Sequence, residues 1–226
     1  MEQRKIKIAP SILSADFANM ERDVKKIALA GADLLHCDVM DGMFVPNISF
    51  GFKMIEDLKK ALTASLKTVP PLDVHLMIAE PERYVQRFVK AGADIVTFHI
   101  EACNSIAETL ALIKSSGAKA GLVANPYTPL DGILPFLKDC DMVLLMSVQA
   151  GFGGQKFMPH VLEKARELKS IIDERGYDTD LEMDGGITLE NAAEAKAAGA
   201  NVIVAGSSVF GAEDWGAAIS GLRDSG

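Results

Sequence analysis

The stretch Ala30-Gly31-Ala32-Asp33-Leu34-Leu35-His36-Cys37-Asp38-Val39 joins the expected end of a helix to an apolar strand. The same arrangement recurs three times: Ala91-Gly92-Ala93-Asp94 precedes IVTFHI, Ser116-Gly117-Ala118-Lys119 precedes AGLVAN, and Ala198-Gly199-Ala200-Asn201 precedes VIVAGS. Glycine ends helices readily because it adopts the left-handed backbone conformation at little cost. Repeated helix-to-strand units predict a parallel sheet covered by helices.

Apolar runs predict eight strands, at Ile6–Ala9, Leu34–Val39, Leu72–Met77, Ile95–Ile100, Ala120–Ala124, Met142–Val148, Leu181–Met183 and Val202–Ala205. Amphipathic stretches between them predict helices that include 17–29, 81–90, 106–115, 161–174 and 189–198. Eight such units predict an α/β chain in which residues 1–226 form a single (β/α)8 TIM barrel domain. The alternative, an open doubly wound sheet, would normally carry its phosphate-binding glycines after the first strand, whereas here they come late.

Composition and charge narrow the class of partner. The chain has 226 residues, of which 31 are acidic and 23 basic, and no run of Lys or Arg stands out, so we expect no nucleic-acid partner. No signal peptide is recognisable and no apolar run approaches about 18 residues, so we expect a cytoplasmic protein without a membrane partner. The cysteines Cys37, Cys103 and Cys140 contain no C-x-x-C pair, which argues against a disulfide framework and a cysteine zinc site.

Two acids, Asp38 and Asp184, each close a short apolar run just before a glycine. Catalytic groups of β/α barrels lie at the C-terminal ends of strands, so both are candidate catalytic residues. His36 faces the same way as Asp38 because strand side chains alternate, while Cys37 faces the helices. His75 occupies a similar position in the next predicted strand.

These four residues, His36, Asp38, His75 and Asp184, predict one divalent metal ion held between two potential proton carriers. A lone barrel histidine is more often a hydrogen-bonded core residue, but four suitable residues at strand ends favour a metal site. Imidazole with carboxylate suits zinc or iron in the first place, with manganese and cobalt as alternatives.

Three methionines, Met40, Met77 and Met146, lie near the ends of the second, third and sixth strands. Methionine commonly fills irregular gaps in a core. The alternative interpretation is a soft wall that excludes water and fits a short polyol chain.

Glycines follow three strands: Gly151-Phe152-Gly153-Gly154-Gln155 after the sixth, Gly185-Gly186 after Asp184, and Gly206-Ser207 after the eighth, before a short helix. Backbone amides of such turns can approach a phosphate closely, and β/α barrels often bind phosphate after strands seven and eight. GFGGQK alone could be an ordinary flexible turn, because it lacks P-loop spacing. Local amide dipoles can bind a dianion despite the net charge of −8.

Over nearly its whole length the chain resembles the ribulose-phosphate 3-epimerase family, whose barrels are of the ribulose-phosphate-binding type. The matching segments are Ile8 to Phe17, His36 to Gly42 with Phe44 to Asn47, Asp73 to Met77, Gly151 to Gln155, Glu182 to Gly186, and Ala205 to Ser207. Several long motifs in the right order make the resemblance specific.

The resemblance implies a role for each candidate. Asp38 and Asp184 would be the acid/base pair and, with His36 and His75, would bind one divalent metal ion. Ser11 and His75 would contact the substrate, beside the active-site methionines Met40, Met77 and Met146. The resemblance also implies phosphate binding by the backbone of Gly151, Phe152, Gly153, Gly154, Gly185, Gly186, Gly206 and Ser207. It suggests a homo-oligomer.

The implied reaction is the interconversion of D-ribulose 5-phosphate and D-xylulose 5-phosphate, by proton transfer at C3 through an enediolate. D-allulose 6-phosphate is an alternative substrate, because Ala150 stands where the family generally has proline, and a freer junction could alter loop fit. A related decarboxylase or aldolase is another alternative. Those enzymes carry a lysine where this chain has Met40, so this chain lacks the cation that their chemistry needs. A catalytically silent sugar-phosphate-binding barrel is a further alternative, because a fold does not guarantee turnover.

Overall fold

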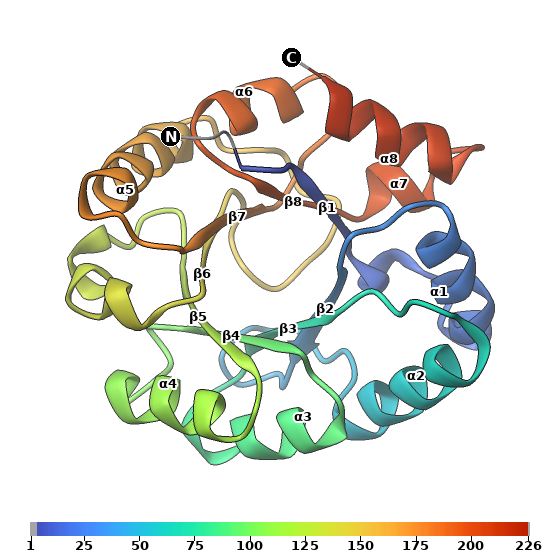
Figure 1. Ribbon diagram of the computed structural model, residues 1–226, viewed down its shortest axis with the longest axis horizontal. Helices are drawn as coiled ribbons and strands as arrows, with labels where there is room; N and C mark the ends of the chain where they lie inside the picture. The colour runs from blue at the N-terminus through green and yellow to red at the C-terminus, as the bar shows by residue number, and fades with distance from the viewer. Residues whose placement is uncertain (1–3, 226) are drawn as a thin grey trace.

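The computed structural model describes residues 4–225, which form a ring of eight parallel strands surrounded by helices (Figure 1). The strands are β1 (Lys7–Pro10), β2 (Leu35–Met40), β3 (Leu72–Met77), β4 (Ile95–His99), β5 (Lys119–Ala124), β6 (Met142–Met146), β7 (Asp180–Asp184) and β8 (Val202–Ala205). Their hydrogen-bonded order is β1-β8-β7-β6-β5-β4-β3-β2, and a parallel bridge between Ser11 and His36 links the two ends. The predicted (β/α)8 barrel is confirmed.

The helices lie outside the strands (Figure 1). They are α1 (Met20–Leu29), α2 (Phe52–Ser65), α3 (Val85–Ala91), α4 (Ile106–Ser115), α5 (Val161–Arg175), α6 (Ala192–Ala197), α7 (Ser207–Phe210) and α8 (Trp215–Asp224). None of the helices within residues 4–225 combines the length and apolar character needed to cross a membrane. The short helix expected after Gly206 is present as α7.

Two expected helices begin differently from the prediction. The segments 17–29 and 81–90 each start with a separate 3-10 turn, η2 (Phe17–Asn19) and η3 (Pro81–Arg83), before α1 and α3. The 189–198 prediction was too long, since α6 begins only at Ala192. Side-chain caps and proline set such boundaries, and hydrophobic spacing does not record them.

The connection between β5 and β6 contains 3-10 turns and no α-helix. These turns are η4 (Leu130–Gly132) and η5 (Leu134–Asp139). Gly132 and Pro135 explain the difference, because glycine weakens an α-helix and proline removes a hydrogen-bond donor from it.

Apolar side chains fill both sides of the sheet. The outward residues, Cys37 among them, pack in one large cluster against the helices, as predicted for that cysteine. Inside the barrel, Leu34, Ile95 and Met142 belong to a small cluster near the strand starts. A second inner cluster at the strand ends contains all three predicted methionines, which are buried there.

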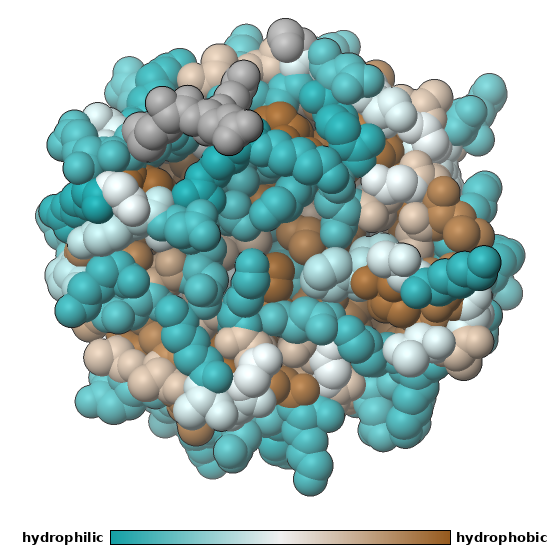
Figure 2. Space-filling view, in the orientation of Figure 1, coloured by the Kyte–Doolittle hydropathy of each residue, from teal (hydrophilic) through white to brown (hydrophobic). Residues whose placement is uncertain are grey.

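Charged pairs cover the N-terminal ends of the strands. Lys7 binds Asp180 at 2.6 Å, and Asp33 binds both Lys5 and Arg223. The face in view in Figure 2 is mainly hydrophilic over the middle of the barrel, consistent with these pairs. The opposite ends of the strands carry the candidate site.

Candidate active site

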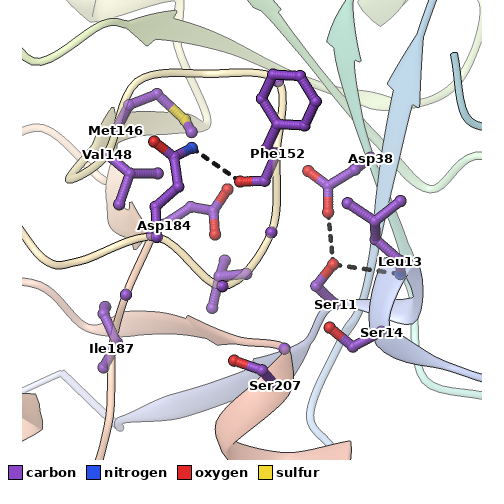
Figure 3. Close-up of a pocket in the computed structure, with 18 of the residues that line it drawn as sticks. Ser11, Leu13, Ser14, Asp38, Met146, Val148, Phe152, Asp184, Ile187 and Ser207 are labelled. Carbon is purple, nitrogen blue, oxygen red and sulfur yellow. Dashed lines mark hydrogen bonds between the residues drawn. The ribbon is translucent and has the colours of Figure 1, made fainter. Parts of the chain in front are cut away.

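A cavity of about 190 Å³ opens at the C-terminal ends of the strands (Figure 3). The predicted residues that line it are Ser11, Asp38, Met40, Met77, Met146, Gly151, Phe152, Gly153, Gly154, Asp184, Gly185, Gly186, Gly206 and Ser207. The two remaining predicted residues, His36 and His75, are fully buried next to Asp38. The structure therefore brings every sequence-predicted site residue into one region.

The four predicted metal ligands form a compact cluster. Each of His36, Asp38, His75 and Asp184 offers a nitrogen or oxygen atom, and these four atoms lie within 4.8 Å of one another. The Oδ1 atom of Asp38 is 3.3 Å from His36 Nε2 and 3.2 Å from His75 Nδ1. Asp184 Oδ2 lies 3.9 Å from His36 Nε2.

Asp73 fixes the orientation of His36. His36 Nδ1 lies 2.6 Å from Asp73 Oδ2, so this carboxylate favours a hydrogen on Nδ1 and leaves Nε2 as the nitrogen that faces the cluster. Within residues 4–225, His36 Nε2 is buried without a hydrogen-bond partner. A buried imidazole lone pair beside carboxylates, with its other nitrogen bound to a carboxylate, is the usual arrangement of a metal-binding histidine. This donor set fits a divalent ion.

The charges around the cluster favour a positive occupant. Burial alone would lower the pKa of His36, but the carboxylates of Asp38 and Asp73 outweigh it and raise that pKa well above its usual range. Burial would raise the pKa of Asp38, but contacts with His36 and His75 hold it well below its ordinary value. Burial lowers the pKa of His75 to about 4.

The two candidate catalytic acids have different surroundings. The Oδ2 atom of Asp38 accepts a 2.5 Å hydrogen bond from the Ser11 hydroxyl. The carboxylate of Asp184 accepts no hydrogen bond from residues 4–225, and its side chain is 16% exposed against 6% for Asp38. Burial, followed by the negative charge of Asp38, raises the pKa of Asp184 to about 7.

The glycines after β7 bring backbone close to backbone. A Cβ atom on Gly185 would lie 2.8 Å from the nitrogen of Val148, and one on Gly186 would lie 2.5 Å from the nitrogen of Phe157. Both glycines have positive φ angles, which other residues rarely adopt. The turn after β7 is therefore closely packed against the chain that follows β6.

Ala150 is buried at the junction of β6 with its glycine-rich loop, and its N–H group donates to Asn125 Oδ1 at 3.4 Å. Proline, which lacks this N–H group, could not make that bond. The consequence for loop mobility remains a prediction.

Several buried polar residues beside the site were not predicted from the sequence, namely Asp73, Thr97, His99 and Glu182. Both carboxylate oxygens of Glu182 lack a hydrogen-bond partner within residues 4–225, and burial followed by Asp73 raises its pKa well above the usual range. Alternation along a strand could have found Asp73 and Glu182, because each lies two residues before a predicted ligand.

Comparison with known proteins agrees with this arrangement. The model of the "Ribulose-phosphate 3 epimerase family" matches residues 7–210. This chain belongs to the ribulose-phosphate 3-epimerase family. A ribulose-phosphate 3-epimerase of Bacillus subtilis is 51% identical over 97% of this chain and 99% of its own length. One from Synechocystis is also 51% identical, over 98% of this chain and 95% of its own.

Solved structures of more distant proteins share the barrel. The thiamine phosphate pyrophosphorylase of Pyrococcus furiosus superposes with a TM-score of 0.64 at 18% identity, covering 96% of this chain and 94% of its own. At that identity the similarity shows the fold alone.

Proposed function

We propose that this family member is an isomerase that interconverts D-ribulose 5-phosphate and D-xylulose 5-phosphate. The observation that carries the proposal is the placement of Asp38 and Asp184, which enter one cavity from β2 and β7 and lie on either side of it (Figure 3). Inversion of a carbon needs proton removal on one face and proton return on the other, so two opposed carboxylates suit it.

The proton transfers follow from the chemistry of a 2-ketose. One carboxylate removes the proton at C3, next to the C2 carbonyl, and the electron pair of the broken C–H bond forms an enediolate. The other acid then returns a proton to the opposite face of C3, which inverts its configuration. The hydrogen bond from Ser11 orients Asp38 during these steps.

The buried donor set of His36, Asp38, His75 and Asp184 would hold one divalent metal ion, with zinc or iron ahead of manganese and cobalt. Such an ion supplies Lewis acidity, which stabilises the negative charge that develops on the substrate oxygens.

Binding of the substrate would involve two parts of the cavity. Met40, Met77 and Met146 provide an apolar wall that excludes water from the enediolate. The phosphate would bind the backbone of Gly151 to Gly154, Gly185, Gly186, Gly206 and Ser207. The substrate is then a small phosphorylated ketose.

The names of the relatives that are 51% identical support the five-carbon substrate over D-allulose 6-phosphate. The buried Ala150 stands where the family generally has proline, so turnover of the five-carbon and six-carbon substrates has to be compared directly. Cytoplasmic location and a homo-oligomeric state remain predictions.

The test is turnover of both ketose phosphates in deuterated water. We expect deuterium at C3 of D-ribulose 5-phosphate, and a loss of about 100-fold to 10,000-fold in rate for Asp38→Asn and for Asp184→Asn. Asp57→Asn on the exposed surface of α2 is the matched control and should retain full activity. Unchanged circular dichroism would show that the variants still fold.

Three results would contradict parts of the proposal. Absence of deuterium in both substrates would favour a silent binding barrel, and faster turnover of the six-carbon substrate would reassign the specificity. Substantial activity in either active-site variant would refute the two-base reaction.

A further inference from the structure

Two buried histidines and a partly exposed glutamate form a row from the proposed metal centre to the loop after β4. The Nε2 atoms of His75 and His99 lie 2.9 Å apart, and the two rings meet edge to edge, with centroids 5.1 Å apart and planes inclined by 26°. On its other side, His99 Nδ1 lies 3.2 Å from Glu101 Oε2. Both histidines are fully buried, so water cannot satisfy their nitrogens in place of these contacts.

The number of protons in this row is limited. Three contacts run from Asp38 through His75 and His99 to Glu101, and each needs one hydrogen to be favourable. A neutral imidazole carries a single N–H group and a single lone pair, so two imidazoles can satisfy only two of the three contacts. The remaining contact then places a lone pair against an acceptor, which favours a cation between them.

Glu101 determines which of the three contacts is left without a hydrogen. Its Oε1 atom already accepts hydrogen bonds from the Asn125 backbone N–H and the Thr128 hydroxyl, at 2.8 and 2.5 Å. Burial would raise the pKa of Glu101, but hydrogen bonds from His99, Thr128 and the Asn125 N–H hold it at about 2, and the last two do not depend on the tautomer of His99. An ionised carboxylate can only accept, so the 3.2 Å contact between Oε2 and His99 Nδ1 is favourable only when Nδ1 carries the hydrogen.

Asn125 offers a competing interaction. Its Nδ2 atom lies 3.4 Å from His99 Nδ1 and would favour the opposite tautomer, in which His99 Nδ1 accepts. The contact with Glu101 is shorter, and a hydrogen bond to an ionised group is about twice as strong as one between neutral groups. The contact with Glu101 therefore determines the tautomer of His99, with the hydrogen on Nδ1.

Neighbouring residues hold this arrangement in place. Lys164 on α5 donates to the carbonyl oxygens of Asn125, Pro126 and Thr128 at 3.0, 2.7 and 2.6 Å, which fixes the loop that binds Glu101. The ring of Phe44 packs 4.8 Å from that of His99. Because His99 is fully buried, its hydrogen bonds are electrostatically stronger than they would be in water.

We propose that His99 and Glu101 are positioning residues that set the tautomer of His75. Glu101 accepts from His99 Nδ1–H, so His99 Nε2 accepts from His75 Nε2–H, and the Nδ1 lone pair of His75 points at the metal cluster. This proposal rests on the proposed metal centre, where Asp73 orients His36 in the same way.

The direct test reads the tautomer of His99 by nitrogen-15 NMR of labelled histidine side chains in the zinc-loaded protein. The chain contains only four histidines, so the signals can be assigned by single substitutions. We expect His99 to carry its proton on Nδ1. The exposed His160 serves as a reference that does not belong to the row.

Four variants then test the consequence for zinc affinity, measured by competition with a chelator. Glu101→Gln supplies an N–H donor in place of the carboxylate, so it should move the His99 proton to Nε2 and weaken zinc binding about 10- to 100-fold. His99→Leu should weaken binding similarly because it removes the acceptor. His99→Gln should rescue binding, since its amide oxygen can accept from His75. Glu82→Gln, which removes a carboxylate bonded to Asn104 in the same loop, should bind like the wild type.

The outcomes separate the two proposals. A wild-type protein that binds no zinc would refute the metal centre itself. A zinc-binding wild type with His99 protonated on Nε2 would refute the positioning role alone, and so would Glu101→Gln with unchanged affinity. The wild-type spectrum keeps the proposal testable even if a variant fails to fold.

Discussion

Replacement of Gly186 by alanine should damage substrate binding through a collision that can be measured in the structure. Gly186 has φ +65°, and the nearest atoms to an added Cβ are Phe157 N at 2.5 Å and Gln155 O at 2.7 Å. Gly176 after α5 has the same φ of +65°, but no atom lies within 4 Å of its added Cβ. Alanine would therefore be held in the same unfavourable backbone conformation at both positions, but it would collide with neighbouring atoms only at Gly186.

The magnitude follows from these distances. Left-handed backbone costs alanine roughly 1–2 kcal/mol at either position. At Gly186 the backbone must also move by about 0.9 Å, the difference between the 3.4 Å of ordinary contact and the 2.5 Å to Phe157 N. A misplacement of about 1 Å can reduce activity about 100-fold, which corresponds to about 2.7 kcal/mol of transition-state stabilisation.

The assay compares kcat/KM for D-ribulose 5-phosphate, together with thermal stability, in the wild type, Gly176→Ala and Gly186→Ala. We expect Gly176→Ala to lose stability with nearly normal kinetics, and Gly186→Ala to lose both, with a raised KM because the proposed phosphate site is displaced. Equal kinetics in the two variants would show that the turn after β7 does not position the substrate, and would refute the reasoning.

Two further predictions concern stability. Removal of the metal by a chelator should lower thermal stability, by about 2.7 kcal/mol if the free ion had been at 100 times its Kd, and zinc should restore it; an unchanged melting temperature would contradict a bound ion. At the other end of the barrel, burial would raise the pKa of Asp33, but bonds from Ile8 N–H, Arg223 and Lys5 lower it below 3.8. Its stabilising effect is therefore complete above the unfolded-state value and disappears as the pH falls through the lower folded-state value. Asp33→Asn should make acid unfolding less steep in that range, and an unchanged pH profile would show that the carboxylate is not responsible.

Much of the barrel was predictable because its signals are local. Apolar runs located all eight strands, four of them just after a Gly-Ala helix end, and no predicted strand end differs from the structure by more than two residues. The connection after β5 was less predictable, since Gly132 and Pro135 allow several tight turns and hydrophobic spacing cannot choose among them. The strand before the glycine-rich loop was predicted to reach Val148 but ends at Met146.

The candidate site was predictable where function lies at strand ends. Asp38, His75 and Asp184 each stand near such an end and were found from that position alone. Glu101 could not be found in this way, because it lies in a loop that turns back onto β4, and no periodic pattern records that turn. Alternation along β3 could have marked Asp73 as a residue on the same side as His75, but its contact with His36 requires knowledge of which residues of the neighbouring strand face it.

The register between β2 and β3 supplies that knowledge. The strands carry their polar residues in opposite orders, as His36-Cys37-Asp38 and Asp73-Val74-His75. They are parallel, and the register places His36 opposite Asp73 and Asp38 opposite His75. The reversed order therefore creates two cross-strand histidine–carboxylate contacts, at 2.6 and 3.2 Å.

A slip of one residue would turn one of the two polar sets toward the helices and break both contacts. The two short motifs thus depend on each other through the sheet, and neither alone determines the site. A sequence shows that both motifs exist, but the pairing becomes visible only when the register is known. For this reason the ligands could be predicted from the chain, whereas the contacts that orient them could not.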